Sequence, residues 1–209
     1  MAAILYLKAS PRGPRSHSSA VADAFLDAYF LAHPQDTLTV KNLFDAELPA
    51  YDGFTIRAKY NILHNNQHDP DEARAWGAVE RIVAEFKACD KMVMAVPMWN
   101  FSLPCRLKHY LDRIVQPGLT FGVDSQGKYT GLVADKPVFI AYASGGEYPS
   151  GTAQEGYDFQ KPYLEMMLNF MGLTKVRSAR AEATLGAAST ATARRERAIA
   201  QAMEIVKDF

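Results

Sequence analysis

The chain has 209 residues, of which 48% are hydrophobic and 22% charged, and we expect residues 1–209 to form a single globular domain. Lys and Arg together number 23, as do Asp and Glu, so no net charge favours nucleic acid or an anionic membrane surface as a partner. Cys89 and Cys105 form no CxxC pair, the N-terminus lacks a signal-peptide pattern, and no apolar run approaches about 20 residues. These features predict a cytoplasmic protein with no membrane partner.

The N-terminal part of the chain predicts two strands around one helix. Residues 3–7, AILYL, are a short β-prone run that ends at a loop rich in Ser, Pro, Arg and Gly. Apolar residues then recur at helical spacing, which predicts a helix capped by Ser16 or Ser18. Residues 37–43 predict a second strand. Residues 44–70 show no clear periodicity and stay unassigned, although FTIRAKYNIL within them is compatible with a short helix.

The middle of the chain contains the clearest helix and a buried strand. Acidic residues load the start of the segment 69–90, and Pro70 suits a first helical turn. Residues 91–97, KMVMAVP, are a continuous apolar run, typical of a parallel strand that is buried on both faces. Residues 103–115 return to helical spacing and predict the next helix.

The remaining elements continue the alternation. They are a hairpin (residues 119–133), a strand with a Gly-rich end (136–146), a helix (157–171), a strand (174–183) and a C-terminal helix (188–209). Ser189 or Thr190 is the predicted cap of the last helix. Strand and helix thus alternate about five times, which predicts an α/β fold with a doubly wound, five-stranded parallel sheet and helices on both faces.

Three loops fall at the carboxyl ends of the predicted strands, where such sheets bind ligands. Residues 9–18 open a helix whose free N–H groups attract phosphate, although a plain capped loop with serine turns explains the same residues equally well. Residues 97–102 place aromatics around Asn100 and offer a flat wall with one amide. Residues 143–148 contain a Gly pair that lets backbone amides approach a ligand. Together the loops predict a site for a phosphate at one end and a planar ring at the other.

The motifs KASPRGPRSHSS, PMWNFSLPCRLKHYLDRI, GLTF and ASGG, in this order, resemble those of the FMN-dependent NADH-azoreductases. This flavodoxin-like family is related to the NAD(P)H:quinone oxidoreductases, and the resemblance covers nearly the whole chain. It implies a homodimer with one FMN per subunit at the interface. It also implies ping-pong reduction of quinones and cleavage of aromatic azo compounds to amines, with NADH as the donor and NADPH left open.

The same resemblance assigns residues to the cofactor and to the substrate. The implied FMN-binding residues are Ser10, Ser16, His17, Ser18, Pro97, Met98, Trp99, Asn100, Phe101, Ala143, Ser144, Gly145 and Gly146. The implied substrate pocket is lined by Trp99, Phe121, Tyr148 and Phe170, with Phe170 supplied by the partner subunit or, equally, placed as an ordinary core residue. Trp99, Ser144 and Val123 depart from residues common in the family, which leaves FMN binding intact and changes the expected acceptor preference.

The implied chemistry needs no catalytic side chain, because the cofactor carries it. The hydride of NADH passes to the flavin N5, and backbone amides of residues 144–146 stabilise the resulting negative charge. No metal is expected, since His64 and His68 have no third ligand at metal spacing. An alternative function is a flavodoxin-like FMN electron carrier with a protein partner, although such carriers are smaller and strongly acidic. A flavin-free scaffold conflicts with the intact set of three loops.

Overall fold

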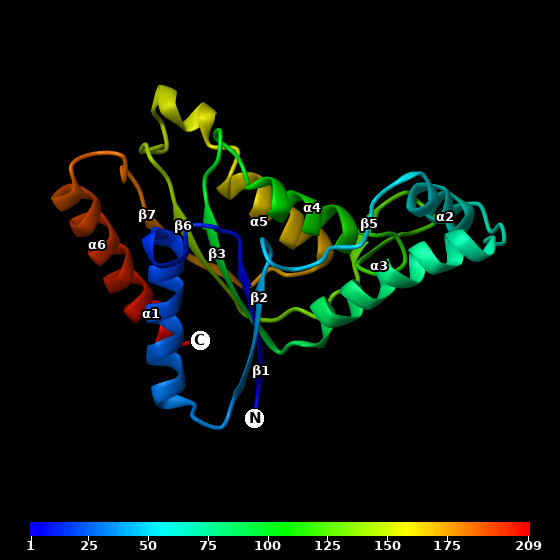
Figure 1. Cartoon of the computed structure of the whole chain (residues 1–209), viewed down its shortest axis with the longest axis horizontal. Helices are drawn as coiled ribbons and strands as arrows, with labels where there is room; N and C mark the ends of the chain where they lie inside the picture. The colour runs from blue at the N-terminus through cyan, green and yellow to red at the C-terminus, as the bar shows by residue number, and fades with distance from the viewer.

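The computed structural model describes residues 1–209, and its centre is a five-stranded parallel sheet in the order β2-β1-β3-β6-β7 (Figure 1). The strands are β1 Ala3–Lys8, β2 Thr37–Asn42, β3 Lys91–Pro97, β6 Val138–Ala143 and β7 Val176–Ala181. The chain adds β2 on one side of β1 and all later strands of this sheet on the other side. This is the doubly wound, flavodoxin-like order, and the predicted fold class is confirmed.

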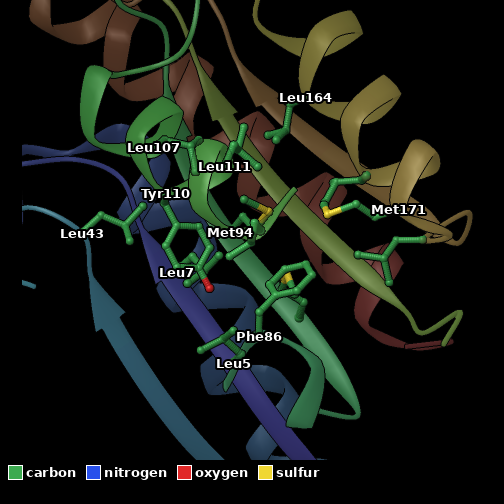
Figure 2. Close-up of a cluster of buried hydrophobic side chains, with 14 of the residues drawn as sticks. Leu5, Leu7, Leu43, Phe86, Met94, Leu107, Tyr110, Leu111, Leu164 and Met171 are labelled. Carbon is green, nitrogen blue, oxygen red and sulfur yellow. The ribbon is translucent and has the colours of Figure 1, made fainter. Parts of the chain in front are cut away.

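Helices cover both faces of the sheet. They are α1 His17–Ala32, α2 Gly53–Leu63, α3 Pro70–Ala88, α4 Cys105–Ile114, α5 Lys161–Met171 and α6 Ala188–Val206. Helices α1 and α6 lie side by side on one face, and α3, α4 and α5 pack on the other (Figure 1). Side chains of β1 alternate between the two cores: Ile4 and Tyr6 pack under α1 and α6, whereas Leu5 and Leu7 join the core shown in Figure 2. Burial on both faces explains why β3 and β6 are almost uniformly apolar.

Polar side chains fix where α1 and α3 begin. Ser16, one of the two predicted caps of α1, accepts a backbone N–H of the first helical turn at 3.2 Å. Asp69 and Glu72 form a reciprocal capping box at the start of α3. The buried Glu72 carboxylate also accepts from Arg57 at 3.1 Å and from Asn61 at 2.9 Å, both on α2. The short helix within the unassigned segment is therefore present and is held against α3.

The helix predicted from residue 157 begins later, at Lys161. Residues Ala153–Tyr157 form a 3-10 helix instead. The Asp158 carboxylate accepts the N–H groups of Gln160 at 3.0 Å and of Lys161 at 3.1 Å, and this turn separates the two helices.

The C-terminal helix α6 begins at Ala188 without a side-chain cap. The prediction that Ser189 or Thr190 caps it is wrong, because both residues lie inside the first helical turn. Neither α6 nor any other helix combines the length and the apolar character that crossing a bilayer requires.

The predicted hairpin lies outside the main sheet. Strands β4 Phe121–Val123 and β5 Tyr129–Gly131 pair antiparallel. Strand β5 packs so closely on the end of α5 that a Cβ added to Gly131 would lie 2.5 Å from the Cα of Gly172. The hairpin is thereby fixed beside the C-terminal end of α5.

Candidate functional site

The carboxyl ends of β1, β3 and β6 meet at one edge of the sheet, and the three predicted loops surround a hollow of about 170 Å³ there. Nine of the thirteen predicted cofactor residues line it: Ser10, Ser16, His17, Pro97, Met98, Trp99, Ala143, Ser144 and Gly145. Of the other four, Ser18, Asn100 and Gly146 directly follow lining residues, and Phe101 follows Asn100. Residues that were selected because they follow the carboxyl ends of predicted strands therefore lie close together in the structure.

The first loop presents the positive end of a helix to the hollow. The backbone N–H groups of His17 and Ser18 donate to no group of the protein, because α1 starts at His17. The Ser16 and Ser18 hydroxyls lie 3.2 Å apart and are both buried. Free N–H groups, hydroxyls and the helix dipole together form a cradle of the kind that suits an anion, called the anion cradle below.

Two arginines add positive charge around this cradle. Arg12 lines the hollow, and Arg195 reaches the same region from α6. Burial, followed by the charges of Arg12 and Arg195, holds the pKa of His17 below its ordinary value of 6.5. The Nδ1 atom of His17 is buried and has no hydrogen-bond partner. A bound anion would satisfy this nitrogen and offset the clustered positive charge.

The second loop is a tight turn that presents aromatic rings. Trp99 and Ser102 exchange backbone hydrogen bonds, and Asn100 and Phe101 between them have φ of +46° and +67°. Positive φ at both central positions is the pattern of a type I′ turn. The turn leaves Trp99 37% exposed and Phe101 49% exposed. The Phe101 ring lies edge-on to that of Tyr148, with 6.4 Å between ring centroids.

The third loop offers free backbone amides. The N–H groups of Gly145 and Gly146 donate to no protein group, whereas the Ser144 N–H is used by the Ala181 carbonyl. A Cβ on Gly145 would lie 2.6 Å from Cγ of Leu185, and one on Gly146 would lie 3.1 Å from the Tyr148 hydroxyl. The two glycines therefore allow side chains of neighbouring segments to approach while their amides stay available.

A fourth loop, which the sequence analysis did not single out, completes the hollow. Thr184 and Leu185, between β7 and α6, line it together with Arg12. The Ser144 carbonyl accepts from the Thr184 N–H at 3.1 Å and from its hydroxyl at 2.9 Å. Leu185 is 87% exposed. The signal was present in the sequence, because this loop also follows the carboxyl end of a parallel strand.

The four residues predicted for the substrate pocket do not meet within one chain. Trp99 lines the hollow and Tyr148 stands beside Phe101. Phe121, on β4 of the hairpin, instead packs on Phe170 of α5 at 4.7 Å between ring centroids. Phe170 lies near the end of α5, and the residue just before α5, Gln160, donates to the carbonyl of Val96 at the other end. At about 1.5 Å per residue, α5 places Phe170 roughly 15 Å along the helix from that contact.

Fold and site thus define the class: a flavodoxin-like α/β protein with an anion-attracting, aromatic-walled hollow at the carboxyl edge of its sheet. A family model described as "Flavodoxin-like fold" matches residues 2–206. The chain is 51% identical over 210 residues to an FMN-dependent NADH:quinone oxidoreductase of Nitratidesulfovibrio vulgaris, with 100% of both chains covered. It is 43% identical to the protein of that description from Desulfotalea psychrophila, covering 97% of this chain and 93% of the relative.

Among solved structures, an azoreductase from Bacillus anthracis str. Sterne superposes with a TM-score of 0.89 at 27% identity, covering 100% of both chains. The protein belongs to the flavodoxin-like family and, within it, to the FMN-dependent NADH:quinone oxidoreductases. It is therefore an oxidoreductase, and the predicted resemblance is confirmed.

Proposed function

We propose that this protein binds FMN in the hollow and uses NADH to reduce quinones, with aromatic azo compounds as further acceptors that are cleaved to amines. The proposal rests on one observation: the hollow has unused hydrogen-bond donors at both ends and an aromatic wall between them. The relatives from Nitratidesulfovibrio vulgaris and Desulfotalea psychrophila are FMN-dependent NADH:quinone oxidoreductases, which supports the same chemistry.

The helix end of the hollow fits a phosphate. The free N–H groups of His17 and Ser18, the Ser10 and Ser16 hydroxyls and the unpartnered His17 Nδ1 would hold it. Arg12 and Arg195 supply positive charge opposite a phosphate dianion. The attraction between these charges is stronger here than in open solvent, because the serines of the cradle are buried.

The other end of the hollow fits a planar ring with polar edges. Pro97, Met98 and Trp99 form its wall, and the adjacent turn carries Asn100 and Phe101. When bound, FMN supplies hydride transfer between the dinucleotide and the acceptor. The amides of Gly145 and Gly146 are placed to stabilise negative charge at the edge of the ring, in the manner of an oxyanion hole. These residues bind and polarise the cofactor, and no side chain acts as a nucleophile.

We propose further that two copies of the chain share the site. A hollow of 170 Å³ is smaller than the roughly 300–1,000 Å³ typical of ligand pockets, so one chain leaves a flavin ring largely uncovered. Trp99, Phe101, Tyr129 and Phe159 are all exposed aromatics that a second subunit would cover. In such a dimer, Phe121 and Phe170 of one subunit would face the ring held by the other. Donor and acceptor would then use the same covered face in turn, which is the basis of a ping-pong scheme.

The first test is the visible spectrum of the purified protein, followed by anaerobic addition of NADH and then of a benzoquinone. Bleaching of a flavin spectrum by NADH and its recovery with quinone, with parallel lines in double-reciprocal plots, would support the proposed reaction. A yellow protein that neither NADH nor NADPH bleaches would favour an electron carrier. A colourless protein that refuses added FMN would contradict the assignment. Light scattering that gives 23.1 kDa, the mass of one chain, would contradict the shared site.

A further inference from the structure

A second hollow, of about 720 Å³, has no role in the function described so far. It lies along the outer edge of β7, the last strand of the sheet, between the start of α5 and the outer side of α6. Ser178 and Arg180 of β7 form its floor, Lys161 contributes from α5, and Arg194 and Arg197 contribute from α6. Figure 1 shows α6 and β7 side by side at this end of the molecule.

This second hollow adjoins the first, because two loops contribute residues to both hollows. Gly145 lines the first hollow, and Glu147 and Tyr148 of the same loop line the second. Likewise Thr184 lines the first hollow and Glu182 the second. The Tyr148 ring contacts the Phe101 ring edge-on on one side and lines the larger hollow on the other. A molecule that stacks its head against the aromatic wall can therefore extend its tail past Tyr148 into this space.

Some of the basic side chains that line the second hollow are free to bind an anion. Four basic and three acidic side chains line it. Arg197 forms no ion pair. Arg194 pairs with Glu147 at 2.6 Å, but both side chains are more than a third exposed, so this pair is weak and exchangeable. Arg180 is paired through Nη2 with Asp158 at 2.9 Å and with Glu182 at 2.7 Å, and only its buried Nε has no hydrogen-bond partner. Arg194 and Arg197 therefore carry the positive charge that is left for a ligand. Arginine forks match phosphate oxygens well.

We propose that this second hollow binds the adenosine diphosphate half of the reduced nicotinamide dinucleotide. The inference rests on the proposed function, which puts the nicotinamide ring at the first hollow. The rest of the dinucleotide carries two phosphates and, at its far end, a flat base. Beyond Tyr148 the adjoining space offers Arg194 and Arg197 for the phosphates and, farther along α6, Gln201 and Ile205 for the base. A hollow of about 350 Å³ also adjoins the first through Ser102, but Lys108 is the one basic side chain that lines it, which suits two phosphates less well.

The test compares two hydride donors on the FMN-loaded protein. NADH carries the adenosine diphosphate half, whereas 1-benzyl-1,4-dihydronicotinamide lacks everything beyond the nicotinamide ring. Arg197→Ala is expected to raise KM for NADH roughly tenfold, because a charge-assisted contact is lost, and Arg197→Glu is expected to raise it further. KM for the benzyl compound is expected to stay within about twofold in both variants.

Arg81→Ala is the matched control, since Arg81 is also an exposed helical arginine without an ion pair, on α3 at the far side of the molecule (Figure 1). Calorimetry with ADP gives a second readout: binding to wild type and to Arg81→Ala, with affinity reduced about tenfold in Arg197→Ala. Unchanged KM for NADH in Arg197→Glu, or no ADP binding to wild type, would overturn the proposal. A wild-type protein whose FMN neither donor reduces would instead contradict the proposed function, and ADP calorimetry would still decide on the hollow.

Discussion

Trp99 and Ser102 exchange two backbone hydrogen bonds of 2.9 Å, and the turn that they close holds Phe101 at a φ of +67°. Asparagine, as at position 100, adopts this conformation readily, whereas an aromatic residue there costs of order 1–3 kcal/mol. The Phe101 carbonyl accepts the Phe159 N–H at 2.9 Å, so a neighbouring segment helps to keep the turn in place. Because the ring is held at such a cost beside the hollow, we propose that its exposure serves the binding of FMN.

Phe101→Asn separates the turn from the ring. Asparagine tolerates the positive φ, so we expect the free energy of unfolding to stay within about 1 kcal/mol of wild type or to rise. Loss of the aromatic wall is expected to weaken FMN binding by roughly tenfold. Urea unfolding and quenching of FMN fluorescence measure the two effects. Phe54→Ala on α2, where Phe54 is 42% exposed, controls for loss of an exposed ring elsewhere. Equal FMN affinity in Phe101→Asn and wild type would remove this turn from the proposed site.

Gly145→Ala tests the approach of the fourth loop. The added Cβ would collide with the Leu185 side chain, which is 87% exposed and can move. We therefore expect less than about 1 kcal/mol change in stability but weaker FMN binding, because the displaced Leu185 enters the hollow. Adding Leu185→Ala is expected to restore most of the affinity. A double variant that binds FMN no better than Gly145→Ala would show that Leu185 is not the obstacle.

The sequence was sufficient to predict the strands, the parallel sheet and the three loops, because each depends on local composition and on one topological rule. It was not sufficient for contacts between distant segments. Thr184 binds the Ser144 carbonyl across 40 positions of the chain, and Arg195 reaches the His17 region from the last helix. The residue types in ATLGAAST and ARRERA do not mark these positions. Only the place of ATLGAAST after a parallel strand points to Thr184, and the role of Arg195 depends on where α6 packs.

Helix starts show the same limit at short range. Ser16 was a predicted cap and is one, because its hydroxyl has a free N–H of the first turn within reach. Ser189 and Thr190 looked equally suitable, yet α6 begins one residue ahead of Ser189. Packing of Ala191, Ala198 and Ala202 against the rest of the molecule sets that start, and the cap preference is too small to shift it.

Gly131→Ala tests how the hairpin is fixed to α5. Its Cβ would lie 2.5 Å from the Cα of Gly172, which caps α5 with a φ of +107°. Because the colliding atom belongs to the backbone, it cannot rotate away as a side chain could. We expect a loss of about 3 kcal/mol or more in the free energy of unfolding. Gly122→Ala in the same hairpin meets only the Leu132 side chain at 3.8 Å and is the matched control, with an expected change below about 1 kcal/mol. Similar urea midpoints for the two variants would mean that the hairpin is not held against α5 in solution.

The titration of His17 reports on the anion cradle. Burial and the charges of Arg12 and Arg195 hold its pKa below 6.5 in the ligand-free protein. A phosphate dianion in the cradle adds opposite charge, so the pKa is expected to rise when FMN binds. NMR titration of the His17 ring protons, assigned with His17→Asn, measures both states. A pKa that FMN leaves unchanged would place the phosphate elsewhere.

The same residue makes the ligand-free fold sensitive to acid. The pKa of His17 is lower in the folded protein than in the unfolded chain. As the pH falls from about 7.5 through 6.5, the unfolded chain therefore takes up the proton first, and this favours unfolding. Stability from this source is therefore present at neutral pH and declines as the solution is acidified to the folded pKa. Urea unfolding at pH about 7.5 and about 5.5 is expected to show a larger drop for wild type than for His17→Asn. Saturating FMN is expected to reduce that difference, because the bound phosphate favours the protonated ring in the folded state. An equal drop in wild type and His17→Asn would assign the acid sensitivity to other groups.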